Sequence, residues 1–215
     1  MKNNATELVF ILDRSGSMAG LESDTIGGFN SMIRRQKLQE GACFVTTVLF
    51  STEFTTLHDR VPLERVERMT EGDYVPGGCT ALLDAVGDTI KHVKKIHRYV
   101  RPEDVPEHTL FVITTDGKEN ASRRYHLEEI RRLIEQQKER GWEFLFLGAN
   151  IDAIGAARSI GIDEDRAVRY RNDAEGCALN YEEVSAAVGR VRASIPLGRE
   201  WKKRIENDYE SRKAR

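Results

Sequence analysis

Apolar residues in this chain fall into two alternating patterns. Short continuous apolar runs are typical of strands buried on both faces of a parallel sheet. They occupy residues 8–12, 43–50, 109–115 and 142–147, with a weaker run at 168–170. Between them, apolar residues recur at spacings of three and four, which indicates amphipathic helices. The predicted helices lie near residues 26–33, 83–97, 127–134, 152–159 and 178–191.

The order of these elements predicts the fold class. Strands that alternate with helices favour an α/β fold, a doubly wound, mostly parallel sheet with helices on both faces. A further strand is predicted at 54–63, only three residues after the strand at 43–50. So short a link implies a hairpin, which predicts one antiparallel edge strand. We expect Gly41 and Gly141 to end the helices that precede them.

Oxygen-bearing side chains gather in three of the predicted loops. Asp13, Ser15 and Ser17 alternate along a turn directly after the first strand. Thr80 follows two glycines and opens a helix, and Asp116 follows a later strand. The carboxyl ends of parallel strands share one edge of the sheet, where ligands bind. Two carboxylates and three hydroxyls are hard donors that suit Mg²⁺ best, with Mn²⁺ and Ca²⁺ as alternatives.

At these positions the sequence resembles the von Willebrand factor type A family. The family's metal-ion-dependent adhesion site has the pattern Asp-x-Ser-x-Ser, a later Gly-Gly-(x)-Thr and a later Thr-Asp-Gly. The resemblance implies a Rossmann-like fold and direct metal contacts from Ser15 and Ser17. It implies that Asp13 acts through water or by orienting the hydroxyls. Thr80 and Asp116 would exchange between direct and water-mediated contact.

The same resemblance implies a function. The family is known chiefly for binding proteins, and a metal with one open position would take an Asp or Glu carboxylate of a partner. Cys79 departs from the pattern, because it separates Gly78 from Thr80 where many relatives run directly from glycine to threonine. The residues that follow, 81–85, still match the helix that the threonine should begin.

Other interpretations of the motif residues fit less well. Asp13 and its serines could be a helix N-cap. Asp13 could also be an aspartyl-phosphate nucleophile, but the haloacid-dehalogenase pattern wants a second Asp where Ser15 stands. The Ser15–Ser17 turn lacks the glycines of a nucleophile elbow. Gly77 and Gly78 lack the Lys-Ser/Thr of a phosphate loop, and the five histidines show no metal-ligand spacing.

Several further residues are expected near the proposed metal. Glu119 and Asn120 could contact the partner or simply start the next loop. Lys118 and Arg14 are candidate rim residues for an acidic ligand, and they could equally be ordinary solvated charges.

Composition narrows the classes of partner. The chain has 33 Lys and Arg against 35 Asp and Glu, a net charge of −2, which argues against nucleic acid and anionic membranes. No apolar run approaches the roughly 20 residues that span a bilayer. Residues 8–12 are too short for a signal-peptide core of about 7–15 residues. Three scattered cysteines do not make a disulfide framework. We therefore expect a cytoplasmic protein.

The sequence predicts one type A domain over residues 1–195 and a charged helical tail over 196–215. Trp201, Ile205 and Tyr209 recur every four residues, so the tail helix either docks on its own domain or binds a partner. The expected function is metal-dependent protein binding without catalysis. The alternatives are a Mg²⁺-dependent phosphohydrolase and a structural module that binds through its tail.

Overall fold

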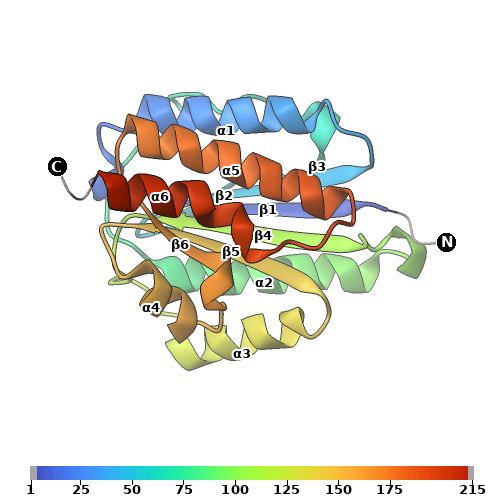
Figure 1. The fold of residues 1–215 in the computed structure, drawn as a ribbon. Coiled ribbons are helices and arrows are strands. Elements are labelled where there is room, and N and C mark those ends of the chain that lie inside the picture. The colour runs from blue at the N-terminus through green and yellow to red at the C-terminus, as the bar shows by residue number, and fades with distance from the viewer. Residues whose placement is uncertain (1–3, 213–215) are drawn as a thin grey trace.

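The computed structural model describes residues 4–212 and contains a six-stranded sheet in the order β3-β2-β1-β4-β5-β6 (Figure 1). The strands are β1 (Thr6–Asp13), β2 (Cys43–Phe50), β3 (Phe54–Pro62), β4 (His108–Thr115), β5 (Trp142–Ala149) and β6 (Ala167–Tyr170). The α-helices are α1 (Glu22–Gln36), α2 (Leu82–Tyr99), α3 (Leu127–Lys138), α4 (Ala153–Ser159), α5 (Ala174–Arg192) and α6 (Lys203–Ser211).

The pairing of the strands confirms the predicted fold class. Strand β1 pairs in parallel with both β2 and β4, and β5 and β6 continue the parallel sheet. Strand β3 runs antiparallel to β2 at one edge. The strand order reverses between β1 and β4, so the carboxyl ends of these two strands flank the topological switch point where ligands bind in open α/β sheets.

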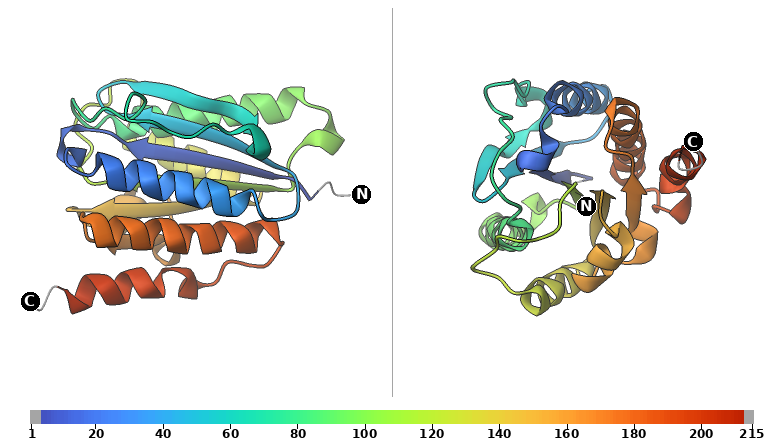
Figure 2. Two further views of the ribbon diagram at one scale, coloured as in Figure 1. Left: turned by 90° about the horizontal axis from the view of Figure 1, so that it is seen from above. Right: turned by 90° about the vertical axis from the view of Figure 1, so that its left-hand side faces the viewer.

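Helices cover both faces of the sheet because consecutive strand residues point to opposite sides. In β1, Phe10 and Leu12 belong to the core under α1 and α5, whereas Val9 and Ile11 belong to the core under α2, α3 and α4. Figure 1 shows these two helical layers, and Figure 2 shows α1 and α5 side by side. The buried β1 therefore carries Asp13 to the edge of the sheet on a rigid support.

Two helix ends differ from the prediction. Helix α1 ends at Gln36, and Gly41, with φ 93°, lies beyond a further turn. The buried Arg192 of α5 explains this, because its guanidinium donates to the backbone carbonyls of Gln36 and Gly41 at 2.6 and 2.9 Å. Helix α3 ends at Lys138, and Gly141, with φ 85°, leads into β5.

The C-terminal segment packs on the edge strand β6. A 3₁₀ turn, Arg199–Lys202, precedes α6, which lies beside α5 in Figure 2. The buried Lys202 donates to the carbonyls of Glu164 and Ala167 at 2.7 and 2.8 Å, and the Trp201 indole donates to that of Asp165 at 2.8 Å. These bonds satisfy backbone acceptors beside an open sheet edge. None of the described helices is long and apolar enough to cross a membrane.

Candidate metal centre

The first part of the site is the turn that follows β1. Asp13 ends the strand, and its Oδ1 accepts a hydrogen bond from the backbone N–H of Ser15 at 2.7 Å, which closes the turn. The Ser15 and Ser17 hydroxyl oxygens lie 3.2 Å apart. Asp13 and Ser15 are buried, and Ser17 is exposed. Alternate residues of the turn thus present one carboxylate and two hydroxyls together.

Strand β4 brings a second carboxylate to the same place. Asp116, the first residue after β4, accepts from the Ser17 hydroxyl at 2.5 Å. Its other oxygen accepts from the side-chain amide of Asn172, which follows β6, at 3.0 Å. Thr115 donates to Asp13 Oδ2 at 2.6 Å. Every hydrogen-bond partner that the described residues give to the two buried carboxylates is therefore neutral.

The glycine loop supplies the third part. The backbone N–H of Gly77 donates to the Arg14 carbonyl at 2.8 Å, and that of Gly16 donates to the Gly78 carbonyl at 3.1 Å. Gly78 has φ 75°, a conformation that favours glycine. These contacts hold the loop against the turn after β1 and place the buried Thr80 at its end.

Gly117 shows that Thr80 faces the other hydroxyls. A Cβ atom built on Gly117 would lie 2.8 Å from Thr80 Oγ1 and 3.8 Å from Ser17 Oγ. Both hydroxyls therefore border the space that the missing side chain leaves open. The structure brings all five predicted residues to one edge of the sheet, from three separate loops.

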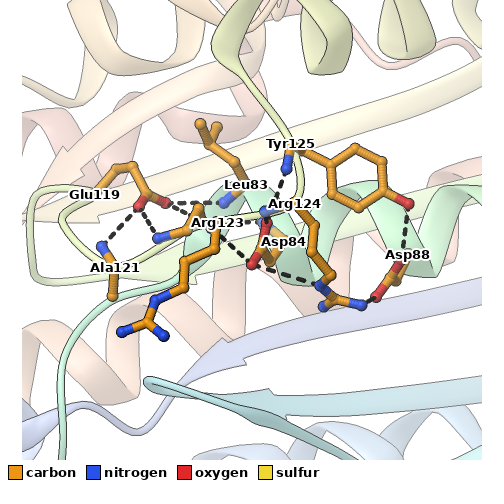
Figure 3. A network of polar contacts seen from close by, with 9 residues as sticks. Leu83, Asp84, Asp88, Glu119, Ala121, Arg123, Arg124 and Tyr125 are labelled. Atoms are coloured by element: carbon orange, nitrogen blue, oxygen red, sulfur yellow. Dashed lines mark hydrogen bonds and ion pairs between the residues drawn. The ribbon is translucent and has the colours of Figure 1, made fainter.

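The residues predicted near the rim hold Thr80 in place. Asn120 Oδ1 accepts from the Thr80 backbone N–H at 2.9 Å, and the Asn120 N–H donates to the Thr80 carbonyl at 3.1 Å. Glu119 accepts from the backbone N–H of Leu83 at 2.9 Å, at the start of α2. Asp84 in turn accepts from three backbone N–H groups of residues 123–125 (Figure 3). Glu119 and Asn120 thus fasten the loop after β4 to α2.

The other rim candidates differ from each other. The Arg14 guanidinium donates to the Thr55 hydroxyl at 3.0 Å and to the Asp73 carbonyl at 3.4 Å, so it is engaged within the protein. Lys118 is exposed. Cys79 is also exposed, and its backbone N–H donates to the Thr52 hydroxyl at 2.8 Å.

Burial sets the electrostatics of the site. It raises the pKa of Asp116 above the ordinary value of 3.8, and the charge of Asp13 adds to this shift. The hydrogen bonds from Ser17 and Asn172 oppose it. A buried carboxylate without a charged partner is costly, and such groups are normally paired or bound to metal. The site therefore favours a cation between the two carboxylates.

The donor set also restricts which metal fits. Among residues 4–212 no group of three or more His, Cys, Asp or Glu is placed to hold a metal. The oxygen donors here are two carboxylates and three hydroxyls, a set that suits a small hard cation and gives no soft ligand for a copper or iron–sulfur site.

Sequence patterns did not indicate two neighbours of the site, Asn172 and Tyr74, whereas Thr115 is the threonine of the Thr-Asp-Gly motif. Asn172 contacts Asp116 from the loop after β6, and Thr115 contacts Asp13 from the last position of β4. The buried Tyr74 hydroxyl donates to the Asp13 carbonyl at 2.5 Å. Of these two missed residues, only Asn172 offered a signal, as a polar residue separated by one position from the end of a strand at the ligand-binding edge.

Solved structures with the same architecture identify the fold. The von Willebrand factor domain of the pilus tip protein Mfa5 from Porphyromonas gingivalis aligns over 90% of this chain and 97% of its own length, with a TM-score of 0.61 and 10% identity. The ArnB paralog VWA2 from Sulfolobus acidocaldarius aligns over 85% of this chain with a TM-score of 0.56 and 20% identity. The chain has the von Willebrand factor type A fold.

A third solved structure with a similar fold was determined with a metal bound. Proximal thread matrix protein 1 from the mussel byssus, solved with a zinc-occupied metal-ion-dependent adhesion site motif, aligns over 86% of this chain with a TM-score of 0.56 and 14% identity. This chain spans 46% of that protein and 45% of VWA2. No family model matches the chain, and no curated protein matches it significantly.

Proposed function

We propose that this chain is a protein-binding module that depends on a divalent metal, with Mg²⁺ as the favoured ion. Asp13, Ser15, Ser17, Thr80 and Asp116 would hold the ion, and an Asp or Glu carboxylate of a protein partner would complete its coordination. The observation that carries this proposal is the convergence of two buried carboxylates and three hydroxyls at the switch point, where every hydrogen-bond partner that the described residues give to the carboxylates is neutral.

The donor set leaves room for an acidic ligand. Three of its five members are uncharged hydroxyls, so the ion would not be crowded by negative charge. Once bound, the ion supplies an electrophilic position for one more oxygen ligand, since Mg²⁺ prefers six oxygens. The protein's own residues orient the donors: Thr115 donates to Asp13, and Asn120 Oδ1 accepts from the Thr80 backbone N–H. An incoming carboxylate is the protein side chain that best matches such a position.

The solved relatives are consistent with a protein partner. One is named as a pilus tip protein and one as a matrix protein. The phosphohydrolase alternative would need a general base and cationic groups to hold a phosphate. Arg14, the cationic residue of the first motif, instead bonds to Thr55 and to the Asp73 carbonyl. These contacts favour binding over catalysis.

A metal titration tests the first half of the proposal. Calorimetry with Mg²⁺ and Mn²⁺ should give one site per chain, and Asp116→Ala should abolish it. Asp59→Ala is the matched control, because it removes an exposed carboxylate of β3 that pairs with His92. Heat from the wild type that is unchanged by Asp116→Ala contradicts the site.

Capture of a partner tests the second half. A protein that binds the immobilised chain in Mg²⁺, elutes in EDTA and loses binding when its own acidic residue is changed to amide would support the proposal. A partner that stays bound in EDTA and to Asp116→Ala would instead favour the surface of the C-terminal segment. Turnover of a phosphate ester with Mg²⁺ that Asp13→Ala abolishes would favour the phosphohydrolase.

A further inference from the structure

A cavity of about 470 Å³ lies at the edge of the sheet opposite the candidate metal centre. The last turns of α2, the end of α3 and the first residues of β4 and β5 surround it. The eight residues of β4 separate the two edges by about 25 Å, because a strand rises about 3.3 Å per residue. Small-molecule sites commonly have volumes in this range. The cavity is therefore distinct from the metal centre and large enough for a ligand of its own.

Positive side chains line this cavity from two helices. Lys94 and Arg98 come from α2, and Arg140 follows the end of α3. Within the part of the chain that the structure describes, none of these three side chains has a hydrogen bond or an ion pair. Glu107 adds one carboxylate to the wall, so the cations outnumber it three to one. The cavity therefore attracts anions.

A smaller cavity beside it shows how cations at this edge are otherwise neutralised. It has a volume of about 200 Å³ and shares Trp142 with the larger cavity. Both of its cations are paired, Lys138 with Asp163 at 2.6 Å and Arg166 with Glu143 at 2.8 Å. Like charges in one cavity repel each other, so an anion bound among the unpaired cations of the larger cavity would lower the free energy.

An aromatic wall of the larger cavity is held rigidly. Trp142, the first residue of β5, stacks on Phe111 with 5.4 Å between ring centres, and the His97 ring meets it edge-on at the same distance. His97 is fixed in turn, because its Nε2 lies 3.5 Å from Oε2 of the buried Glu7. A flat ring of a ligand can pack against a preorganised indole of this kind.

The same wall contains a polar group that folding alone does not explain. Gln137 of α3 is fully buried at the cavity, and neither its Oε1 nor its Nε2 has a hydrogen-bond partner within residues 4–212. An unpaired buried amide is uncommon and lowers stability. An apolar side chain would serve the packing better, so the amide supports a polar occupant of the cavity.

From these features we propose that the cavity binds a small aromatic anion, with its carboxylate or phosphate held by the three cations and its ring packed against Trp142. A nucleotide and an aromatic acid share this chemistry. The cavity has no residue in common with the candidate metal centre, so the inference does not depend on the proposed metal.

Binding of the fluorescent aromatic anion 8-anilinonaphthalene-1-sulfonate tests the cavity. In EDTA the dye should bind the full chain, and its affinity should fall as salt screens the cations. The double variant Lys94→Gln/Arg140→Gln should weaken binding about tenfold, because bonds to charged groups are the strong ones. Lys95→Gln is the matched control, since Lys95 is an exposed neighbour on α2 that does not line the cavity. Equal affinities of the two variants would overturn the proposal.

Competition with the dye identifies the ligand chemistry. Adenosine monophosphate and phenylacetate should both displace it, and the stronger of the two tells a nucleotide site from a site for an aromatic acid. Inorganic phosphate lacks the ring and benzyl alcohol lacks the charge, so each should require about tenfold more. Displacement by inorganic phosphate as effective as that by adenosine monophosphate, or no displacement by either aromatic anion, would overturn the proposal.

Nuclear magnetic resonance locates the ligand, because the chain has two tryptophans. Adenosine monophosphate or phenylacetate should shift the indole N–H signal of Trp142 and leave that of Trp201 in place. Cations near helix C-termini also stabilise the helices, so melting separates that role from binding. The double variant should lose affinity at an unchanged melting temperature. A shift of Trp201 alone, or a loss of affinity that only follows a loss of folded protein, is the contrary result.

Discussion

Gly117→Ala should weaken metal binding without unfolding the protein. The new Cβ would lie 2.8 Å from Thr80 Oγ1, which is shorter than real contacts of this kind, and 3.8 Å from Ser17 Oγ. Thr80 must therefore rotate or move by a few tenths of an ångström. Either change takes its hydroxyl away from the other donors. We expect metal affinity to fall at least about tenfold, a loss of about 1.4 kcal/mol.

The cost to folding should be small by comparison. Replacing glycine by alanine removes freedom from the unfolded chain, which contributes about 0.4–1 kcal/mol and offsets part of the strain. Gly77→Ala is the matched control on the same edge, since its Cβ would meet nothing within 4 Å. Calorimetry measures the affinity of both variants, and melting in EDTA measures their stability. If Gly117→Ala binds Mg²⁺ as tightly as Gly77→Ala does, Thr80 is not a ligand.

Three further predictions concern stability and reactivity. Burial raises the pKa of Asp116. In the metal-free protein, the free-energy cost of ionising this buried carboxylate is therefore absent below pH 3.8, where the group is protonated in both the folded and the unfolded state. The cost is fully present above the raised pKa. Asp116→Asn should therefore melt higher than the wild type in EDTA at neutral pH but not in acid, and equal melting at neutral pH contradicts this. Gly28→Ala would place Cβ 2.1 Å from a tyrosine ring of α5 and should cost about 1–3 kcal/mol in denaturant melts. The adjacent Gly27→Ala meets nothing within 4 Å and should be neutral or stabilising; equal effects of the two would refute the packing argument. The exposed Cys79 should react with a thiol reagent in the native state, whereas burial raises the pKa of Cys177 to about 11 and should protect it until unfolding; fast native labelling of both would be the contrary result.

The sequence predicted the fold and the gathering of the five candidate residues because both follow from local patterns. Continuous apolar runs located the buried strands, and a three-residue link located the antiparallel edge. The convergence of Asp13 and Asp116 then followed from one rule, that parallel strands end at the same edge. No rule of that kind placed the ligand oxygens relative to each other, and the structure was needed to show Ser17 between Ser15 and Asp116.

Contacts between distant side chains account for what the sequence could not predict. Helix α1 ends before Gly41 because Arg192, about 150 positions away in the chain, binds its terminal carbonyls. Asn172 reaches Asp116 across 56 positions, and Asn120 holds Thr80 across 40. Such contacts depend on how loops bend and on which side chains fill the remaining space, and neither property has a periodic signature.

The same contacts explain why the site lowers the folding stability of the metal-free protein. Asp13 and Asp116 are buried near each other, and within residues 4–212 their hydrogen-bond partners are all neutral and the side-chain carbonyl of Asn172 has none. A core optimised for stability alone would replace these groups with apolar ones. The hydrogen bond that Thr115 donates to Asp13 and the one that Asn120 accepts from Thr80 hold the arrangement in place despite that cost. A cation would remove the repulsion between the carboxylates, and this relief is the physical reason for proposing a metal centre here.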